Sequence, residues 1–94
     1  MNTFIIERVV PGASQMSHAD LVEVARTSNR AVASLGVPYE WVTTYVAGDK
    51  FYCVHRTDEI ETVLEHARRG GFPADLVTEL MAEIGPDTAN EAAA

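Results

Sequence analysis

The sequence predicts a single mixed α and β domain, in which one sheet is organised around a central β-hairpin. The hairpin is the stretch 39–55, where two runs rich in aromatic and β-branched residues flank a Gly48-Asp49 turn. A second apolar run, 3–10, ends at Pro11-Gly12 and is typical of a short strand. Along the chain, each of these strand regions is followed by a segment whose apolar residues recur at helical spacing. With 94 residues, the chain can form one modest core but not two.

The composition limits the classes of partner. The chain carries 14 acidic and 7 basic residues, its net charge is −7, and its arginines are scattered. We therefore expect neither nucleic acid nor a membrane as a partner. A single cysteine cannot form an internal disulfide, and the start of the chain lacks the basic region and the apolar length of a signal peptide. The expected location is the cytoplasm.

The first strand contains two neighbouring charges. Side chains alternate along a strand, so Glu7 and Arg8 must point to opposite faces of the sheet. If both faces are covered, at least one of these charges is directed toward something other than bulk solvent. The alternative is that both lie at a frayed strand end.

The first helix is well delimited in the sequence. Ser17 and Asp20 form an S-x-x-D capping pattern, and Gly36 followed by Pro38 ends the helical spacing. The stripe expected to face the core consists of Leu21, Ala25, Ser28, Val32 and Leu35.

The length of the hairpin loop decides which residues share a face of the sheet. An even loop, of two or four residues, places Trp41, Tyr45 and Tyr52 on one face. In that register Cys53 and His55 point to the other face, whereas an odd loop brings them to the aromatic face. We favour the even register, because two-residue loops are the commoner choice.

A second helix is expected after the hairpin. Asp58 and Glu61 match a capping box, and Gly70-Gly71 closes the helix. Its expected buried stripe is Ile60, Val63, Leu64 and Ala67. The apolar residues of segment 76–84 keep helical spacing, but the length of this segment also suits one strand.

Several short motifs occur in this chain in the order in which one protein family has them. They are Ile6-Glu7-Arg8, Trp41-Val42, Tyr45-Val46, Asp49-Lys50, Tyr52-Cys53-Val54, His66-Ala67, Gly70-Gly71-Phe72-Pro73-Ala74 and Pro86-Asp87-Thr88-Ala89. On these residues the sequence resembles a small bacterial ferredoxin-like family that is often called nickel-binding or nickel-responsive. The resemblance implies a dimeric α+β fold, a ferredoxin-like βαββαβ sandwich. Its four-stranded antiparallel sheet has two helices on one face, and 76–84 is the fourth strand. We expect one domain, 1–86, and a mobile C-terminal tail, 87–94.

The same resemblance implies binding of nickel or another divalent transition metal. The family commonly has His at the position of Thr43 and Tyr at the position of His55, so this chain has lost one imidazole and gained another. Imidazole suits nickel. The candidate metal ligands are therefore His55, His66 and Cys53, with a carboxylate such as Glu7 or water completing the set.

Two other functions compete with metal binding. The aromatic face, with Trp41, Tyr45, Tyr52 and Glu7 as candidate ligand contacts, suits a small-molecule binder or a cofactor-free enzyme, and it equally suits a plain structural dimer. Cys53 is also typical of a small buried apolar residue, and His66 of a histidine placed by the helix dipole. No catalytic motif is recognisable in the sequence, so an enzymatic role would rest on fold analogy.

Overall fold

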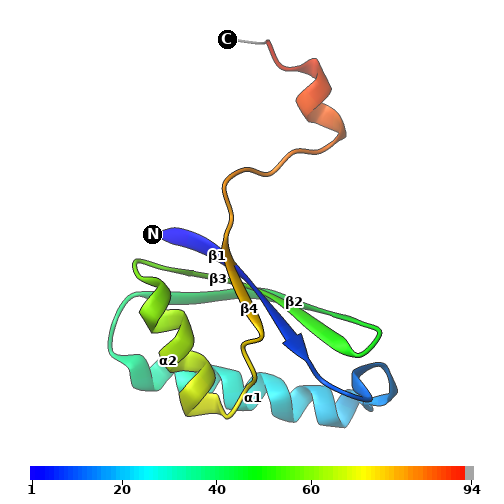
Figure 1. Ribbon diagram of the computed structural model, residues 1–94, viewed down its shortest axis with the longest axis vertical. Coiled ribbons are helices and arrows are strands. Elements are labelled where there is room, and N and C mark those ends of the chain that lie inside the picture. Colours follow the sequence, from blue (N-terminus) through cyan, green and yellow to red (C-terminus); the bar gives the residue numbers. More distant parts are fainter. Residues whose placement is uncertain (93–94) are drawn as a thin grey trace.

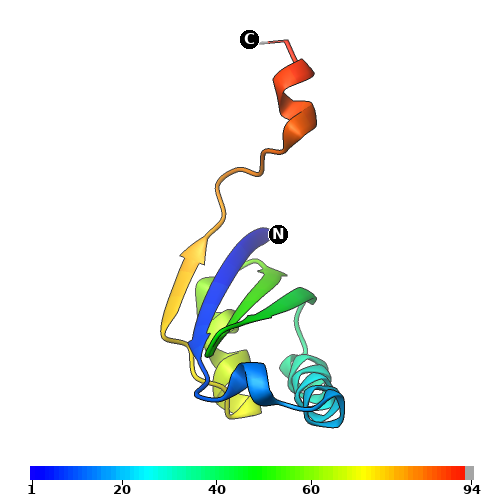
Figure 2. The same ribbon diagram turned by 90° about the vertical axis from the view of Figure 1, so that its right-hand side faces the viewer.

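A computed structural model of the chain describes residues 1–92 and has the expected α+β architecture (Figure 1). In chain order the elements are β1 (Asn2–Val9), η1 (Ala13–Gln15), α1 (His18–Leu35), β2 (Tyr39–Ala47), β3 (Lys50–Thr57), α2 (Ile60–Gly70), β4 (Leu76–Glu79) and η2 (Pro86–Asn90). The strand order in the sheet is β2-β3-β1-β4, and each neighbouring pair is antiparallel. Both α-helices lie on the same face of the sheet (Figures 1 and 2). This topology agrees with the ferredoxin-like sandwich, and the dimer stays a prediction.

The caps of α1 are those that the sequence predicts. The hydroxyl of Ser17 accepts a hydrogen bond from the amide of Asp20 at 3.1 Å, and the Asp20 carboxylate accepts one from the amide of Ser17 at 3.0 Å. At the other end Gly36 has a φ of 68°, the left-handed conformation that closes many helices. Local sequence therefore sets both ends of this helix.

The start and the buried face of α2 differ from the prediction. The residue before the helix is Glu59, so the helix begins later than a box on Asp58 would require. Its buried side chains are Val63, His66 and Ala67. Ile60 and Leu64, which were expected to be buried, are 38% and 47% exposed, because a helix face that includes His66 turns both of them outward.

The hairpin has the expected two-residue loop and one feature that the sequence does not reveal. Ala47 pairs with Lys50 across the turn, which confirms the even register. The pairing of β2 with β3 shifts between Trp41 and Thr43, because Val42 forms a β-bulge. The extra residue turns Trp41 to the helix-covered face. The expectation that Trp41 shares a face with Tyr45 and Tyr52 is therefore wrong.

The last strand is shorter than expected and ends at Glu79 rather than at 84. The amide of Leu80 still bonds the carbonyl of Thr3, and the chain then leaves the sheet (Figure 2). The segment 81–92, which includes η2, is exposed. The domain boundary at 86 and the mobility of the tail, 87–94, stay predictions, and residues 93–94 lie outside the described residues.

The core lies between the sheet and the helices. Its buried cluster consists of Phe4, Ile6, Ala13, Phe51, Cys53 and Val63. Across residues 1–92, we find no helix with the length and apolar character that a bilayer span requires.

Candidate ligand pocket

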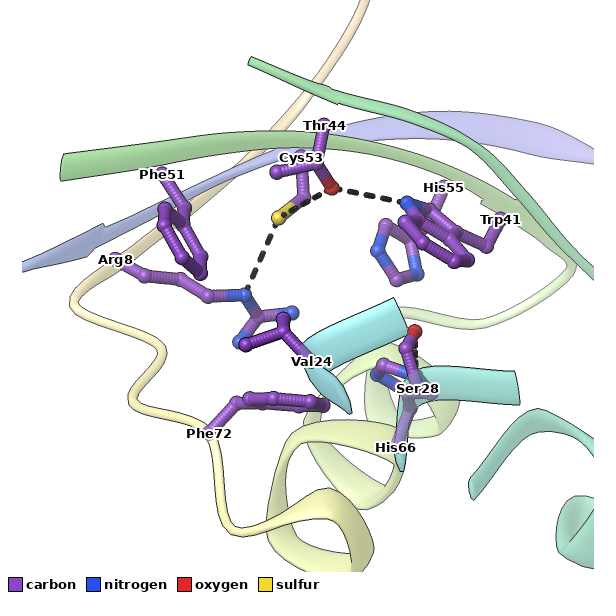
Figure 3. A pocket seen from close by; sticks show the side chains of 10 residues that line it. All are labelled: Arg8, Val24, Ser28, Trp41, Thr44, Phe51, Cys53, His55, His66 and Phe72. Carbon is purple, nitrogen blue, oxygen red and sulfur yellow. Dashed lines mark hydrogen bonds between the residues drawn. The ribbon is translucent and has the colours of Figure 1, made fainter. Parts of the chain in front are cut away.

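A small cavity lies between the helix-covered face of the sheet and the two helices (Figure 3). Its volume is about 20 Å³, roughly the space for one water molecule. The polar side chains that line it are Arg8, Ser28, Thr44, Cys53, His55 and His66. Beside it, between α1 and β2, lies a groove of about 170 Å³ that is lined mostly by apolar residues. The cavity and the groove share the lining residues Val24, Trp41, Thr44 and Phe51, so they lie side by side, and together we call them the pocket.

Arg8 supplies the charge of the cavity and is only 2% exposed. It points inward because every second side chain of β1 faces the helices. Its Nε donates a hydrogen bond to Cys53 Sγ at 3.4 Å, Nη1 donates to the carbonyl of Pro73, and the guanidinium lies 5.3 Å from the centre of the Phe72 ring. None of the ion pairs formed by residues 1–92 includes Arg8. A buried charge is normally paired, so this guanidinium is an exception.

His55 of β3 and His66 of α2 meet inside the cavity. Both are 1% exposed, and their ring centres are 4.8 Å apart. Burial, the neighbouring His66 and Arg8 lower the pKa of His55 to about 3. Burial and Arg8 lower the pKa of His66 to about 4, although the bond to Ser28 acts in the opposite direction. Both imidazoles are therefore neutral near pH 7, and the positive charge of the cavity comes from Arg8.

One nitrogen of each imidazole takes part in a hydrogen bond. The hydroxyl of Tyr39 bonds Nδ1 of His55, and the hydroxyl of Ser28 bonds Nε2 of His66 at 3.1 Å. Burial raises the pKa of Tyr39, so its phenol stays protonated. Within residues 1–92, Nδ1 of His66 is a buried polar atom that has no hydrogen-bond partner. Such atoms are rare in folded proteins and call for an explanation.

Cys53 lines the cavity, and Trp41 lines both the cavity and the groove. Cys53 is 4% exposed, and its sulfur accepts hydrogen bonds from Arg8 and, at 3.2 Å, from the hydroxyl of Thr44. The indole of Trp41 donates to the same hydroxyl at 2.9 Å. The bulge in β2 therefore brings the only tryptophan of the chain into the pocket.

The other candidate ligand contacts lie on the opposite face of the sheet. Glu7 pairs there with Lys50 at 3.3 Å, and Tyr52 lies opposite Glu7 in the sheet. Tyr45 is 62% exposed on the same face. The four residues Trp41, Tyr45, Tyr52 and Glu7 thus do not form one surface, and any ligand role for them stays a prediction.

The three candidate metal ligands, His55, His66 and Cys53, do line one cavity. However, the described part of the chain contains no group of three or more His, Cys, Asp and Glu side chains that could hold a metal ion. The guanidinium of Arg8 also donates to Cys53 Sγ, and a fixed positive charge there opposes the entry of a cation. Residues 1–92 of a single copy therefore provide no donor set that fits nickel, and the metal roles of His55, His66 and Cys53 stay predictions.

Ser28 and His66 have the contact distance of a nucleophile and its base. A catalytic pair of this type also needs a group that orients the base. In the described residues Nδ1 of His66 has no such partner. We therefore read the pair as a polar wall of the pocket, and assign it no catalytic step.

Sequence reasoning did not identify Arg8 or Ser28 as pocket residues. Two signals pointed to them. Arg8 follows Phe4 and Ile6 on one face of its strand, and Ser28 interrupts an apolar helix stripe. A polar residue at a position that should be apolar is a signal of a buried site.

Comparison with known proteins supports the fold. The solved structure of SCO4226 from Streptomyces coelicolor A3(2) matches with a TM-score of 0.71 and 17% sequence identity, over 87% of this chain and 99% of that chain. At this level of identity the likeness concerns the fold alone. No curated protein matches the sequence significantly.

The family model described as nickel responsive protein SCO4226-like matches residues 4–80. This range includes the whole sheet except its first two residues, both α-helices and every residue of the pocket. The match extends over well more than half of the sequence, so the chain belongs to the nickel responsive protein SCO4226-like family.

Proposed function

We propose that this protein binds a small organic molecule in the pocket between α1 and the sheet. The observation that carries the proposal is that a cavity lined by the polar groups of Arg8, His55 and His66 lies next to an apolar groove of about 170 Å³. Ligand sites are typically concave and apolar, with a few polar groups that fix the orientation of the ligand. The groove would hold the body of the ligand, and the cavity would hold its polar end.

The fluorescence of Trp41 can report binding, because Trp41 lines both the cavity and the groove and is the only tryptophan in the sequence. We expect saturable changes in its fluorescence when small aromatic compounds, neutral and charged, are titrated into the protein. Val24→Phe fills the groove and should abolish the change. Ala33→Phe, on the exposed side of α1, is the matched control and should leave the change intact. If no compound at millimolar concentration alters the emission, or if both variants behave alike, the proposal is wrong.

Nickel binding is a second candidate function. The family description suggests it, and the unpartnered Nδ1 of His66 beside His55 favours it within the described chain. Further donors would have to come from water or from a second copy of the chain. A metal that binds only the folded state raises its stability, by about 2.7 kcal/mol at a hundred times Kd.

The pH dependence of the nickel effect identifies the ligands. Metal binding needs neutral imidazole. With pKa values of about 3 and 4, His55 and His66 would keep a nickel-induced rise in melting temperature down to about pH 5. A rise that depends on an ordinary exposed histidine fades below about pH 6.5. The double variant His55→Ala, His66→Ala should lose the rise, and His18→Ala should keep it. A rise that survives in the double variant would exclude the pocket as the metal site.

The cytoplasmic location and the homodimer are proposals of the same kind. The acidic composition supports the absence of nucleic acid partners.

A further inference from the structure

We infer that the pocket recognises the carboxylate of a small organic monoanion, with Arg8 as the group that binds it. This inference rests on the proposed function, since it names the chemical class of the ligand. Two observations carry it: a guanidinium that forms no ion pair within the described residues, and a neutral hydrogen-bond donor beside it.

The guanidinium of Arg8 has unused donor capacity inside the pocket. Nε and Nη1 bond Cys53 and Pro73, whereas Nη2 donates to none of the described residues. Two carboxylates near Arg8 in the sequence or the fold have other partners: Glu7 pairs with Lys50 on the opposite face, and Asp75 accepts the amide of Val9 at 2.6 Å. Burying a cation is unfavourable unless an anion accompanies it. The fold therefore holds a positive charge that a ligand anion would balance.

His55 supplies the second donor. When the protonated phenol of Tyr39 donates to Nδ1 of His55, that nitrogen is the acceptor of the ring. The neutral ring then carries its own hydrogen on Nε2, for which the described hydrogen bonds include no acceptor. In Figure 3 the side chains of Arg8, His55 and His66 converge on the same space. An oxygen that enters this space meets donors from both Arg8 and His55.

The single charge of the cavity favours a carboxylate over a phosphate. A volume of about 20 Å³ accommodates roughly one oxygen-sized group, so one oxygen of the carboxylate would enter the cavity beside Arg8. One guanidinium balances one negative charge, and a hydrogen bond from Nη2 to a carboxylate oxygen would be of the strong, charge-assisted kind. The rest of the ligand would lie against Leu21, Val24 and Val46 in the groove. The expected ligand is thus an apolar body, aromatic or aliphatic, with one carboxylate.

Fluorescence titration of the wild-type chain with benzoate, benzamide and phenyl phosphate tests the charge and the shape of this head group. Benzoate should quench or shift the emission of Trp41 saturably and bind at least about tenfold more tightly than its neutral isostere benzamide, because a hydrogen bond to an ion is the stronger kind. Phenyl phosphate should bind more weakly than benzoate. Equal affinity for benzoate and benzamide overturns the inference and leaves the proposed function standing. Tighter binding of phenyl phosphate overturns the carboxylate class, and binding of none of the three contradicts both proposals.

The variant Arg8→Met tests the assigned residue. It should lower benzoate affinity to that of benzamide, while benzamide affinity stays unchanged. The matched control is Arg56→Met, because Arg56 is exposed and pairs with Glu40 at 3.3 Å. Circular dichroism and the thermal melt establish that each variant is folded. If Arg8→Met does not fold, the wild-type comparison of benzoate with benzamide still decides the inference. Retention of the benzoate preference in folded Arg8→Met overturns it.

Discussion

His55 and His66 are buried in neutral form beside a permanent cation. Arginine stays protonated in proteins. Repulsion between positive charges in the cavity therefore keeps the imidazoles, and not Arg8, in the neutral form. Burial and Arg8 act in the same direction on both rings, and lower their pKa values to about 3 and 4. The cavity thus combines one fixed charge with neutral donors and acceptors. This combination suits an anion better than a metal cation.

The lowered pKa values predict a loss of stability in mild acid. The unfolded chain takes up protons on both histidines below about pH 6.5, whereas the folded chain does so only near pH 3 and 4. Their contribution is fully present above pH 6.5 and is lost as the pH falls toward the folded values. At pH 5 each should cost roughly 2 kcal/mol of unfolding free energy relative to pH 8.

Urea denaturation at pH 8, 6 and 5 measures this loss, in a range above the usual carboxylate pKa values. The variant His66→Gln should remove about half of the pH dependence. His18→Gln, which changes an exposed side chain at the start of α1, should leave most of it. Equal unfolding free energies of the wild type at pH 8 and pH 5 would contradict the assignment of buried neutral histidines.

Individual elements differ in how far their own sequence determines them. The ends of α1 follow from Ser17 and Gly36, because capping is a local interaction. The even hairpin follows from the Gly48-Asp49 turn. The bulge at Val42 has no local signal, since it depends on how β2 fits β3 and α1. That one extra residue changed the face of Trp41, and the sequence-based site was wrong at this point.

The candidate site was predictable only in part for the same reason. Cys53 and His55 were correctly placed on the face opposite Tyr45, because alternation along β3 is regular. His66 was placed in α2, but its burial required knowledge of how the helix is rotated about its axis. Arg8 became interpretable only when the structure showed that its face of β1 is covered and that no carboxylate of the described chain pairs with it. Arg8 and Cys53 form a hydrogen bond although they lie 45 residues apart in the sequence. The spacing of neighbouring residues cannot reveal such a contact.

For a single element, we predict how much the capping box of α1 contributes to stability. Ser17→Ala removes the hydroxyl that accepts the Asp20 amide and should lower the unfolding free energy by about 1 kcal/mol. Ser14→Ala is the control, because this exposed serine lies in η1, outside the cap. Urea melts of the two variants should therefore differ by about that amount. Equal stability of both variants would mean that packing, and not the cap, holds the start of α1.

For the whole molecule, the distribution of helices leaves one face of the sheet open. Both helices cover the face that carries the pocket (Figure 2). The open face presents apolar side chains from all four strands: Ile5, Tyr45, Val54 and Leu76, of which Tyr45 and Leu76 are 62% and 52% exposed. Met81 and Ile84, in the segment that leaves the sheet, are 83% and 80% exposed. Monomers rarely expose extended apolar surface, so a second copy is the expected cover.

The open face therefore predicts a homodimer, even without the contribution that Trp41 was expected to make. Light scattering after size-exclusion chromatography should give twice the chain mass of 10.2 kDa at micromolar concentration. Tyr45→Glu places a charge on the open face and should shift the mass to that of the monomer, since a buried unpaired carboxylate opposes association. Leu64→Glu introduces the same charge on the exposed side of α2 and should leave the dimer intact. A wild-type protein that elutes with the mass of one chain would instead mean that this face is solvated. Binding in the pocket would then belong to the single chain, because every residue assigned to the carboxylate lies on the helix-covered side.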